Sequence, residues 1–366
     1  TGCKGCREDP GNGQGNCETE CESGQSCVEG ACAPCTDCPR FATVVGGGSN
    51  DVFNAVAVDS AGNIYAAGRF AGVMQIGDQY LTSENGTSDG LLIKFSPTGR
   101  YIWHKIVSGI SLVELNDVAV DAMDNVYVTG NYAGSATLDG NPLPAPDGAD
   151  LLVISFDSTG ATRWSNTLNG TGTDIGNSIA IDPVDGDVVV VGRYSGSVST
   201  LTSAGGNDVL AWLLDSNGVE KNLRGFGSTS TDEALAVTID GASNIYVTGY
   251  FSFSVNWGTN IDTTSTGSRD IFVARLSDNL EPSWVAAGGG SSGDDAEDII
   301  VGSDGNIYVV GDFINSMTIG ATMLTNVGDN DIFLASIDAS GAWNWATSLG
   351  SGGADSGLGL AESNAS

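Results

Sequence analysis

A motif that recurs at intervals of about 60 residues is the feature that most constrains this chain. The stretch Asp59-Ser-Ala-Gly-Asn-Ile-Tyr65-Ala-Ala-Gly68 returns three times closely and once loosely. Its final glycine recurs at nearly even spacing, at Gly68, Gly130, Gly192, Gly249 and Gly311. A fixed period of this kind is the sequence signature of an array of similar structural units.

Two other markers share this period. An aspartate stands before an alternating apolar run in every repeat, at Asp89, Asp150, Asp208, Asp270 and Asp331. A tryptophan follows in four repeats, at Trp103, Trp164, Trp284 and Trp345, and Asn222 takes its place in the third repeat. Three independent markers with one period indicate five complete repeats.

Each repeat carries the pattern of four antiparallel strands. In the first repeat, residues 55–59 alternate between apolar and other residues, and a Ser-Ala-Gly-Asn turn leads into residues 64–68, which predicts a hairpin. Residues 91–95 and 101–106 predict the third and fourth strands, and the connection 74–83 predicts a small outer hairpin. Helical periodicity is absent from residue 40 onward, so the fold class is all-β.

Four short antiparallel strands per repeat predict the blade of a β-propeller. We therefore expect a β-propeller of five complete four-stranded repeats, with terminal strands of an incomplete sixth blade. The expected domains are a cysteine-rich module at 1–40 and the propeller at 41–366. The repeats cover about 47–107, 108–168, 169–226, 227–288 and 289–349, with a partial copy at 350–366.

The composition excludes several classes of protein. A formal net charge of −32 repels phosphate backbones and anionic lipids, so we expect no binding to nucleic acid. Apolar runs stay well short of the roughly 18 residues of a membrane span, so we expect no membrane insertion. The single histidine, His104, removes most histidine-based catalysis and any histidine-rich metal site.

All eight cysteines lie within the first 38 residues. They are Cys3, Cys6, Cys17, Cys21, Cys27, Cys32, Cys35 and Cys38. An even number in a segment with almost no aliphatic residues predicts a small module held by disulfides, and zinc is the alternative because two Cys-x-x-Cys pairs have ligand-like spacing. Disulfides persist in oxidising compartments, so we expect an extracellular or cell-surface protein in its mature form, after removal of a signal peptide.

The repeats resemble the bacterial β-propeller repeats often called SBBP repeats. The resemblance is carried by residues 244–249, Asn-Ile-Tyr-Val-Thr-Gly, and 270–276, Asp-Ile-Phe-Val-Ala-Arg-Leu, and it covers about 41–361. It implies the propeller fold and an exported surface protein, and it implies little about activity. The chain departs from the pattern at Val189 in the tyrosine position, at Asn222 in the tryptophan position and at residues 112–115 in the loop of the second repeat.

Residues outside the five repeats align with parts of a further one. Residues 41–46 align with a fourth strand and residues 356–361 with a first strand. The residues expected to pair there are Phe41, Val44, Val45, Leu358 and Leu360. Unpaired strand edges accept strands from other chains, so one hypothesis is self-association head to tail into an extracellular filament, by strand complementation of the termini and through the cysteine module. The alternative is that these segments pack on the ring.

Acidic residues recur in the loops before each first strand, for example Asp51 and Asp174, and calcium is the one cofactor that they suggest. Together with the aspartate markers they would ring one face, and carboxylate oxygens suit Ca²⁺. The candidate ligands are Asp51, Asp89, Asp174, Asp208, Asp232, Asp270, Asp294 and Asp331. The alternative, which the sequence alone favours, is that these aspartates cap turns by accepting backbone N–H groups.

The recurrent tryptophans are expected to pack between blades, whereas Trp257 and Trp343, outside that register, are candidates for an exposed contact. Asn85, Asn169 and Asn364 stand in glycosylation sequons. The chain has no nucleophile elbow, P-loop or zinc-protease motif. We therefore expect a non-enzymatic structural or adhesive protein. The alternatives are a monomeric propeller that binds extracellular glycans or proteins, and a glycoside hydrolase based on carboxylates.

Overall fold

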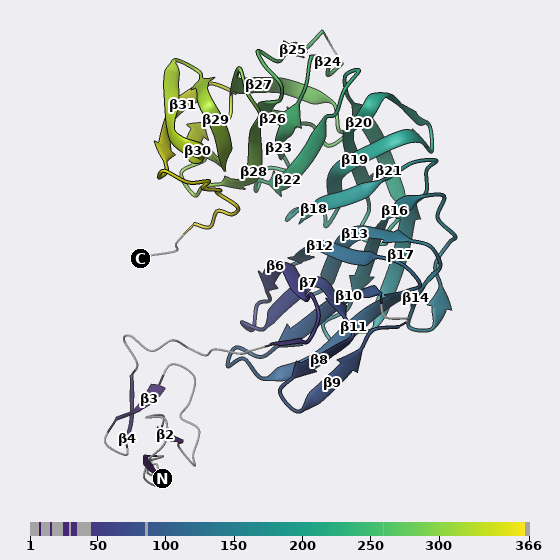
Figure 1. The fold of residues 1–366 in the computed structure, drawn as a ribbon. Coiled ribbons are helices and arrows are strands. Elements are labelled where there is room, and N and C mark those ends of the chain that lie inside the picture. Colours follow the sequence, from purple (N-terminus) through teal and green to yellow (C-terminus); the bar gives the residue numbers. More distant parts are fainter. Residues whose placement is uncertain are drawn as a thin grey trace.

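The computed structural model describes residues 45–84, 87–258 and 260–362, together with short strands between residues 7 and 34. The fold is all-β, and five four-stranded antiparallel units follow one another along an arc (Figure 1). Each unit coincides with one sequence repeat, and we number them 1 to 5. The predicted fold class is therefore confirmed.

Within each unit the chain runs from an inner strand to an outer strand. Unit 1 consists of β6 (Val52–Val58), β7 (Ile64–Ala71), β10 (Ser88–Phe95) and β11 (Tyr101–Gly109). Unit 2 consists of β12 (Val113–Val120), β13 (Val126–Ala133), β16 (Ala149–Phe156) and β17 (Thr162–Leu168). Unit 3 consists of β18 (Ile175–Ile181), β19 (Val188–Val198), β20 (Leu201–Leu214) and β21 (Glu220–Phe226).

Units 4 and 5 repeat this order. Unit 4 consists of β22 (Glu233–Ile239), β23 (Ile245–Phe251), β26 (Asp270–Leu276) and β27 (Pro282–Gly290). Unit 5 consists of β28 (Asp294–Val301), β29 (Ile307–Ile319), β30 (Thr322–Ile337) and β31 (Trp343–Leu349). A β-bulge interrupts the first strand of every unit at the same place, between Phe53 and Ala55 in unit 1.

The turns between strands form because an aspartate binds their backbone. In unit 1, Asp59 Oδ1 accepts hydrogen bonds from Ala61 N at 3.0 Å and Asn63 N at 2.8 Å. This is the Asx turn, which short polar side chains stabilise locally. Gly62 lies inside this turn at a φ of 79°, a left-handed conformation that glycine adopts without steric cost.

An outer hairpin of one unit pairs with the last strand of the unit before it. Strand β14 (Ala136–Leu138), which pairs with β15 (Asn141–Pro142), lies beside β11. In the same way β8 (Val73–Ile76), which pairs with β9 (Gln79–Thr82), lies beside β5 (Val45–Gly47). Strand β5 thus takes the place of a fourth strand, as its sequence predicts. Unit 4 carries the hairpin of β24 (Ser254–Asn256) and β25 (Asp262–Thr264).

The hydrophobic core is divided into layers between successive units. One layer combines Tyr65 and Leu92 of unit 1 with Val118, Leu152 and other residues of unit 2. Equivalent layers lie between units 2 and 3, 3 and 4, and 4 and 5. Strands are buried on both faces, so each unit depends on its neighbours for stability.

The arc is open between unit 5 and unit 1 (Figure 1). The inner strands β6, β12, β18, β22 and β28 each contact the next along the arc. Within the described ranges, no comparable contact joins β28 back to β6. Two faces of the described structure therefore lack the neighbour that every internal unit has.

The amino-terminal segment contains two short backbone ladders. Strand β1 (Arg7–Glu8) pairs with β2 (Gly15–Asn16), and β3 (Gln25–Val28) pairs with β4 (Ala31–Pro34). The backbone register of the second ladder places Cys27 opposite Cys32. The other predicted disulfide cysteines lie outside the described residues, so the disulfide module remains a prediction. In the part of the chain that is described, no helix has the length and apolar character needed to cross a membrane.

Candidate functional site

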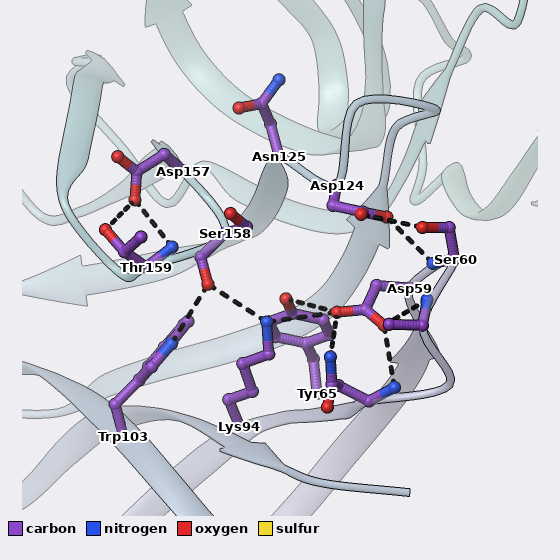
Figure 2. A network of polar contacts seen from close by, with 12 residues as sticks. Asp59, Ser60, Tyr65, Lys94, Trp103, Asp124, Asn125, Asp157, Ser158 and Thr159 are labelled. Atoms are coloured by element: carbon purple, nitrogen blue, oxygen red, sulfur yellow. Dashed lines mark hydrogen bonds and ion pairs between the residues drawn. The ribbon is translucent and has the colours of Figure 1, made fainter.

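A repeated polar contact joins each unit to the turn between the third and fourth strands of the next unit, and Figure 2 shows it for units 1 and 2. Trp103 Nε1 and Lys94 Nζ both donate to the carbonyl oxygen of Ser158, at 3.4 and 3.1 Å. Lys94 also forms a buried ion pair with Asp59, at 3.1 Å from its Oδ2. The turn between β16 and β17 of unit 2 is thereby bound by side chains of unit 1.

The carboxylate of Asp59 is the centre of this network (Figure 2). Burial alone would raise its pKa, but hydrogen bonds from Asn63, Lys94 and Tyr65 outweigh burial and hold the pKa of Asp59 below its usual value. Burial and the neighbouring Asp59 charge raise the pKa of Tyr65, whose hydroxyl donates to Asp59 Oδ2 at 3.1 Å. Asp59 therefore stays ionised at neutral pH and acts as a structural acceptor.

The recurrent tryptophans make the same contact at other junctions. Trp164 Nε1 donates to Ser216 O, and Trp284 Nε1 donates to Ala339 O, both at 3.1 Å. Asn222, in the tryptophan position of unit 3, instead donates its side-chain amide to Asn279 O of unit 4. These residues are packing anchors between units, in agreement with the interpretation from sequence.

We call the leading face of unit 1 the face that corresponds to the one that units 2 to 5 each pack against the unit before them. This face exposes an aliphatic side chain that the other units bury. Val56 of β6 is 69% exposed. The equivalent residues of units 2 to 5 are between 2% and 8% exposed: Val118, Ile179, Val237 and Ile299. Val58, on the same strand, is 59% exposed. The difference follows from the missing neighbour, because each equivalent residue packs against the preceding unit.

The opposite face of unit 5, which we call the trailing face, shows the complementary pattern. Leu349 of β31 is 58% exposed, whereas the equivalent Val107, Leu168 and Phe226 are between 1% and 8% exposed. Trp345 is 42% exposed and has the position from which Trp284 reaches over the next unit. The outer part of the trailing face is thus uncovered in the described structure.

Residues 356–362 lie against this trailing face in the place of a further inner strand. Leu360 N donates to Asp298 Oδ2 of β28 at 2.6 Å. The equivalent bond between units 2 and 3 runs from Ile179 N of β18 to Asp117 Oδ2 of β12, at 2.8 Å. Glu362 accepts hydrogen bonds from the backbone and hydroxyl of Ser303. The segment has no strand assignment, which differs from the expected first strand.

The residues predicted to mediate assembly divide between these regions. Val45 pairs with Ile76 in the β5–β8 ladder, and Leu358 is 74% exposed beside the trailing face. Leu360 is half-buried. Phe41 and Val44 lie outside the described residues. The assembly role of all five residues stays a prediction.

The aspartates proposed from sequence as calcium ligands accept backbone hydrogen bonds. Those in the loops before first strands, the loop aspartates, bind the backbone four residues earlier: Asp51 accepts from Gly47 N at 2.7 Å and Asp232 from Ser228 N at 2.6 Å. Asp294 accepts from Gly290 N at 2.7 Å. These contacts fit the turn-capping interpretation, and calcium binding remains a prediction.

The aspartates of the second kind, the marker aspartates, lie in third strands and also cap turns. Asp89 Oδ2 accepts from Glu84 N at 2.9 Å, Asp208 Oδ2 from Ala204 N at 2.7 Å, and Asp270 Oδ2 from Thr266 N at 2.8 Å. Asp331 Oδ2 accepts from Val327 N at 2.9 Å. All four are buried.

The structure joins loop and marker aspartates across units. The backbone N–H of Asp174, in the loop before unit 3, donates at 2.7 Å to Ala149 O, which immediately precedes the marker Asp150 of unit 2. Along the sequence, each loop aspartate stands 34 to 38 residues before the marker aspartate of its own repeat, as Asp51 does before Asp89. The spatial pairs join one unit to the next because the loop lies over the junction. No group of three or more His, Cys, Asp or Glu side chains suited to a metal occurs among the described residues.

The remaining predicted sites have the following surroundings. Asn169 is exposed, as a glycosylated asparagine must be, whereas Asn85 and Asn364 lie outside the described residues. His104 Nδ1 is 2.7 Å from the hydroxyl of Tyr101, and burial lowers the pKa of His104. Glycosylation stays a prediction, and His104 has a local structural partner.

The expectation that Trp257 is exposed is wrong. Its side chain is 1% exposed and lies 4.7 Å from the ring of Phe272, measured between centroids. The hairpin β24–β25 folds back over the layer between units 3 and 4 and carries Trp257 into it. Trp343 is half-buried and packs against the layer between units 4 and 5.

An acidic group in units 4 and 5 breaks the repeat, and sequence reasoning missed it. Glu297 occupies the bulge position where units 1 to 3 have Asn54, Asn116 and Asn177. Burial, reinforced by the charge of Asp295 and other carboxylates, raises the pKa of Glu297 to about 7. Aligning the bulge positions of the repeats would have identified this replacement.

Asp295, beside Glu297 on β28, also has a strongly raised pKa. Burial raises its pKa to about 6, even though Arg269 lies 2.7 Å from its Oδ2. Its Oδ1 is buried without a hydrogen-bond partner among the described residues. Raised pKa values at one place are typical of both structural carboxyl clusters and acid–base sites.

Comparisons with known proteins agree with a repeat fold and extend no further. No family model matches the chain. A match at 23% identity over 137 residues joins 34% of this chain to 10% of an uncharacterized WD repeat-containing protein of Acanthamoeba polyphaga mimivirus, so the chain spans only a small part of that relative.

A structural match has a TM-score of 0.37 and 10% identity, and it covers 82% of each chain. The matched structure is a crystal structure of a protein of unknown function from Bacteroides caccae. The similarity is too low to support an argument about function. The all-β units and the WD-repeat similarity together describe a β-propeller-type repeat protein.

Proposed function

We propose that this chain is a non-enzymatic extracellular structural protein of the SBBP type, and that its leading and trailing faces join copies head to tail. The observation that carries the proposal is the exposure of Val56, which is 69% against at most 8% at the four equivalent positions. A valine or isoleucine packs at this position in every internal junction, and it is uncovered only in unit 1, before which the structure describes no further unit.

The partner that fits the leading face is a trailing face of the same protein. At each internal junction, the face of one unit that corresponds to the trailing face packs on the face of the next unit that corresponds to the leading face. The layers between units are built from equivalent positions. The trailing face of unit 5 belongs to this series, as the exposed Leu349 and Trp345 indicate, and β6 of the next copy takes the inner-strand place that residues 356–362 hold in the single chain. Because the two faces lie at different places on the chain, their association is heterologous and continues as a filament.

The charge of the chain bears on when such contacts form. A net charge of −32 makes copies repel one another, and at 0.1 M ionic strength salt screens the repulsion between charges more than about 10 Å apart. The contact itself is apolar, and burial of one Val or Leu side chain contributes about 1.5–3 kcal/mol. Assembly is therefore expected to strengthen with ionic strength, unlike an association held by ion pairs.

Sedimentation and negative-stain electron microscopy of the full chain at rising concentration, at low and at high salt, test the proposal. Wild type is expected to form linear assemblies that lengthen at high salt. The variant Val56→Asp, which places a charge in the contact, is expected to remain monomeric. Val184→Asp is the matched control, since Val184 is 67% exposed but lies in the turn between β18 and β19, away from both faces.

Three results contradict the proposal. The first is wild type that stays monomeric under all these conditions, which favours a monomeric glycan- or protein-binding propeller. The second is assembly of Val56→Asp to the same extent as wild type. The third is an equal loss of assembly in Val184→Asp, which would assign the effect to charge alone.

A carboxylate-based hydrolase is a second candidate, favoured by the single observation that Glu297 interrupts the repeat with a raised pKa. Glycoside hydrolysis needs one protonated and one ionised carboxyl group. If Glu297 is the acid, turnover of a polysaccharide by wild type disappears in Glu297→Gln and persists in Glu281→Gln, a control at a carboxylate that pairs with Arg224. Absence of turnover on a broad polysaccharide panel removes this candidate.

A further inference from the structure

Buried aspartate pairs occupy the junctions between successive units. In each pair a marker aspartate belongs to one unit, and a loop aspartate stands immediately before the first strand of the next unit or is its first residue. The three enclosed pairs are Asp150 with Asp174, Asp208 with Asp232, and Asp270 with Asp294, and all six residues are at most 3% exposed.

The backbone holds the members of each pair together. Asp174 N donates to Ala149 O at 2.7 Å, and the equivalent bonds of the other loop aspartates are Asp232 N to Asn207 O at 2.8 Å and Asp294 N to Arg269 O at 3.1 Å. At the first pair both carboxylates lie against Gly170. Its N–H faces Asp150 Oδ1 at 3.5 Å, and a Cβ atom on it would lie 2.2 Å from Asp174 Oδ2.

Every enclosed pair contains a carboxylate oxygen without a donor. Asp150 Oδ2 and Asp174 Oδ2 are both buried and lack a hydrogen-bond partner in the described structure. The other two pairs each have one such atom, Asp208 Oδ1 and Asp270 Oδ1. Buried polar atoms are nearly always paired, so a recurrent exception at equivalent positions needs an explanation.

The junction between units 1 and 2 provides an internal comparison. Val113 follows Asp89 at the same interval at which Asp174 follows Asp150, so a valine stands there in the position of the loop aspartate. Both oxygens of Asp89 are satisfied, Oδ1 by Gly109 N at 3.1 Å and Oδ2 by Glu84 N at 2.9 Å. The unpartnered oxygen is therefore found where two aspartates meet and is absent at this junction of the described chain, where one stands alone.

Two ionised carboxylates buried together without a positive charge are strongly unfavourable. Asp150 and Asp174 meet in this way between units 2 and 3, and Asp270 and Asp294 do so between units 4 and 5. No ion pair within the described ranges involves any of these four residues. A bound cation would supply the missing charge and the missing partner for both free oxygens.

We propose that a calcium ion binds between Asp150 and Asp174 and fastens unit 2 to unit 3. Equivalent ions would bind the pairs Asp208–Asp232 and Asp270–Asp294. Calcium suits the site because it takes about 6–8 oxygen ligands in flexible geometry, so that two carboxylates, oxygen atoms of the 170–174 loop and water can complete its shell. Magnesium requires a stricter octahedron and gives up its water reluctantly, so it is expected to bind more weakly here.

Calcium binding to the full chain, stripped with chelator and held at mildly alkaline pH, tests this site. The measurements are isothermal titration and the metal content after equilibrium dialysis, with magnesium as the comparison ion. Asp174→Asn is expected to lower the stoichiometry by one ion relative to wild type. Asp89→Asn is the matched control, a buried marker aspartate without a paired carboxylate, and it is expected to leave the stoichiometry unchanged.

Thermal unfolding supplies a second readout that needs no variant. Calcium well above its dissociation constant is expected to raise the melting temperature of wild type, because an ion that binds only the folded state stabilises it. The proposal is overturned if millimolar calcium yields no binding heat and no change of melting temperature. It is also overturned if Asp174→Asn and Asp89→Asn bind the same number of ions, or if magnesium binds as tightly as calcium.

Discussion

The indole ring of Trp284 lies on Gly341 of the next unit, so close that a Cβ atom on the glycine would be 2.8 Å from Trp284 Cδ2. Trp164 and Gly218 form the same pair at the junction of units 2 and 3. Unit 3 has Asn222 in the tryptophan position, and the turn it reaches in unit 4 carries Leu280, a buried leucine at a φ of 58°. At this junction the large apolar side chain therefore belongs to the turn of the following unit, as Leu280, and not to the preceding unit, where the other junctions have a tryptophan.

Gly341→Ala is expected to lower the free energy of unfolding by about 2–4 kcal/mol, in two parts. The left-handed φ of 86° costs an alanine about 1–2 kcal/mol, and displacement of the Trp284 ring adds to this. The control is Gly305→Ala, at a φ of 80° with no atom within 4 Å of the added Cβ, which is expected to cost only about 1–2 kcal/mol. Equal losses in urea unfolding would show that the tryptophan contact adds nothing.

Trp284→Ala is expected to destabilise the protein more than Trp345→Ala. The first removes a ring that packs on Gly341 and a hydrogen bond to Ala339 O, a loss of about 3 kcal/mol. The second removes a side chain that is 42% exposed at the trailing face, a loss of about 1 kcal/mol. Thermal unfolding at a concentration that keeps both variants monomeric provides the comparison, and a larger effect of Trp345→Ala would be inconsistent with an open trailing face.

Lys94→Met is expected to lower the free energy of unfolding by about 3–5 kcal/mol, the range for a broken buried ion pair. It leaves the buried carboxylate of Asp59 without its cation, and the pKa of Asp59 should rise. Lys105→Met is the control, because its ion pair with Asp139 is partly exposed and exposed pairs contribute about 1 kcal/mol or less. Chemical denaturation of both variants at neutral pH measures the difference, which should shrink at a pH low enough to protonate Asp59.

Stability is expected to fall as the pH rises from about 4 to about 7. Burial raises the pKa of Asp117 from 3.8 to about 6, so the folded state binds this proton more tightly than the unfolded state does. The resulting contribution, about 2–3 kcal/mol, is fully present below the unfolded pKa and is lost as the pH passes through the folded pKa.

The variant Asp117→Asn identifies the residue responsible. Its carboxamide oxygen can still accept from Ile179 N, which donates to Asp117 Oδ2 at 2.8 Å, but the side chain no longer titrates. Denaturation midpoints measured in steps across this pH range should therefore change less than in wild type. An unaltered pH profile would assign the effect to the other carboxyl groups with raised pKa values, such as Glu297.

The sequence by itself determined the repeating unit and its local turns. The alternation of residues 55–59 and the aspartate that accepts Asn63 N depend on atoms a few residues apart, so each repeat carries the information for its own strands. The fourth-strand character of residues 41–46 was also readable, because they copy segments inside the chain, and β5 (Val45–Gly47) takes that place. Periodicity therefore predicted the units, their order and the roles of the recurrent tryptophans.

Only the tertiary structure decided which residues meet between units. Asp174 could have paired with Asp208 of its own unit, but the loop lies over the preceding junction and brings it to Asp150. A repeat with one period cannot distinguish a neighbour before it from a neighbour after it, since both present the same sequence. The burial of Trp257 by its hairpin and the exposure of Val56 follow from packing in space, which spacing along the chain does not encode.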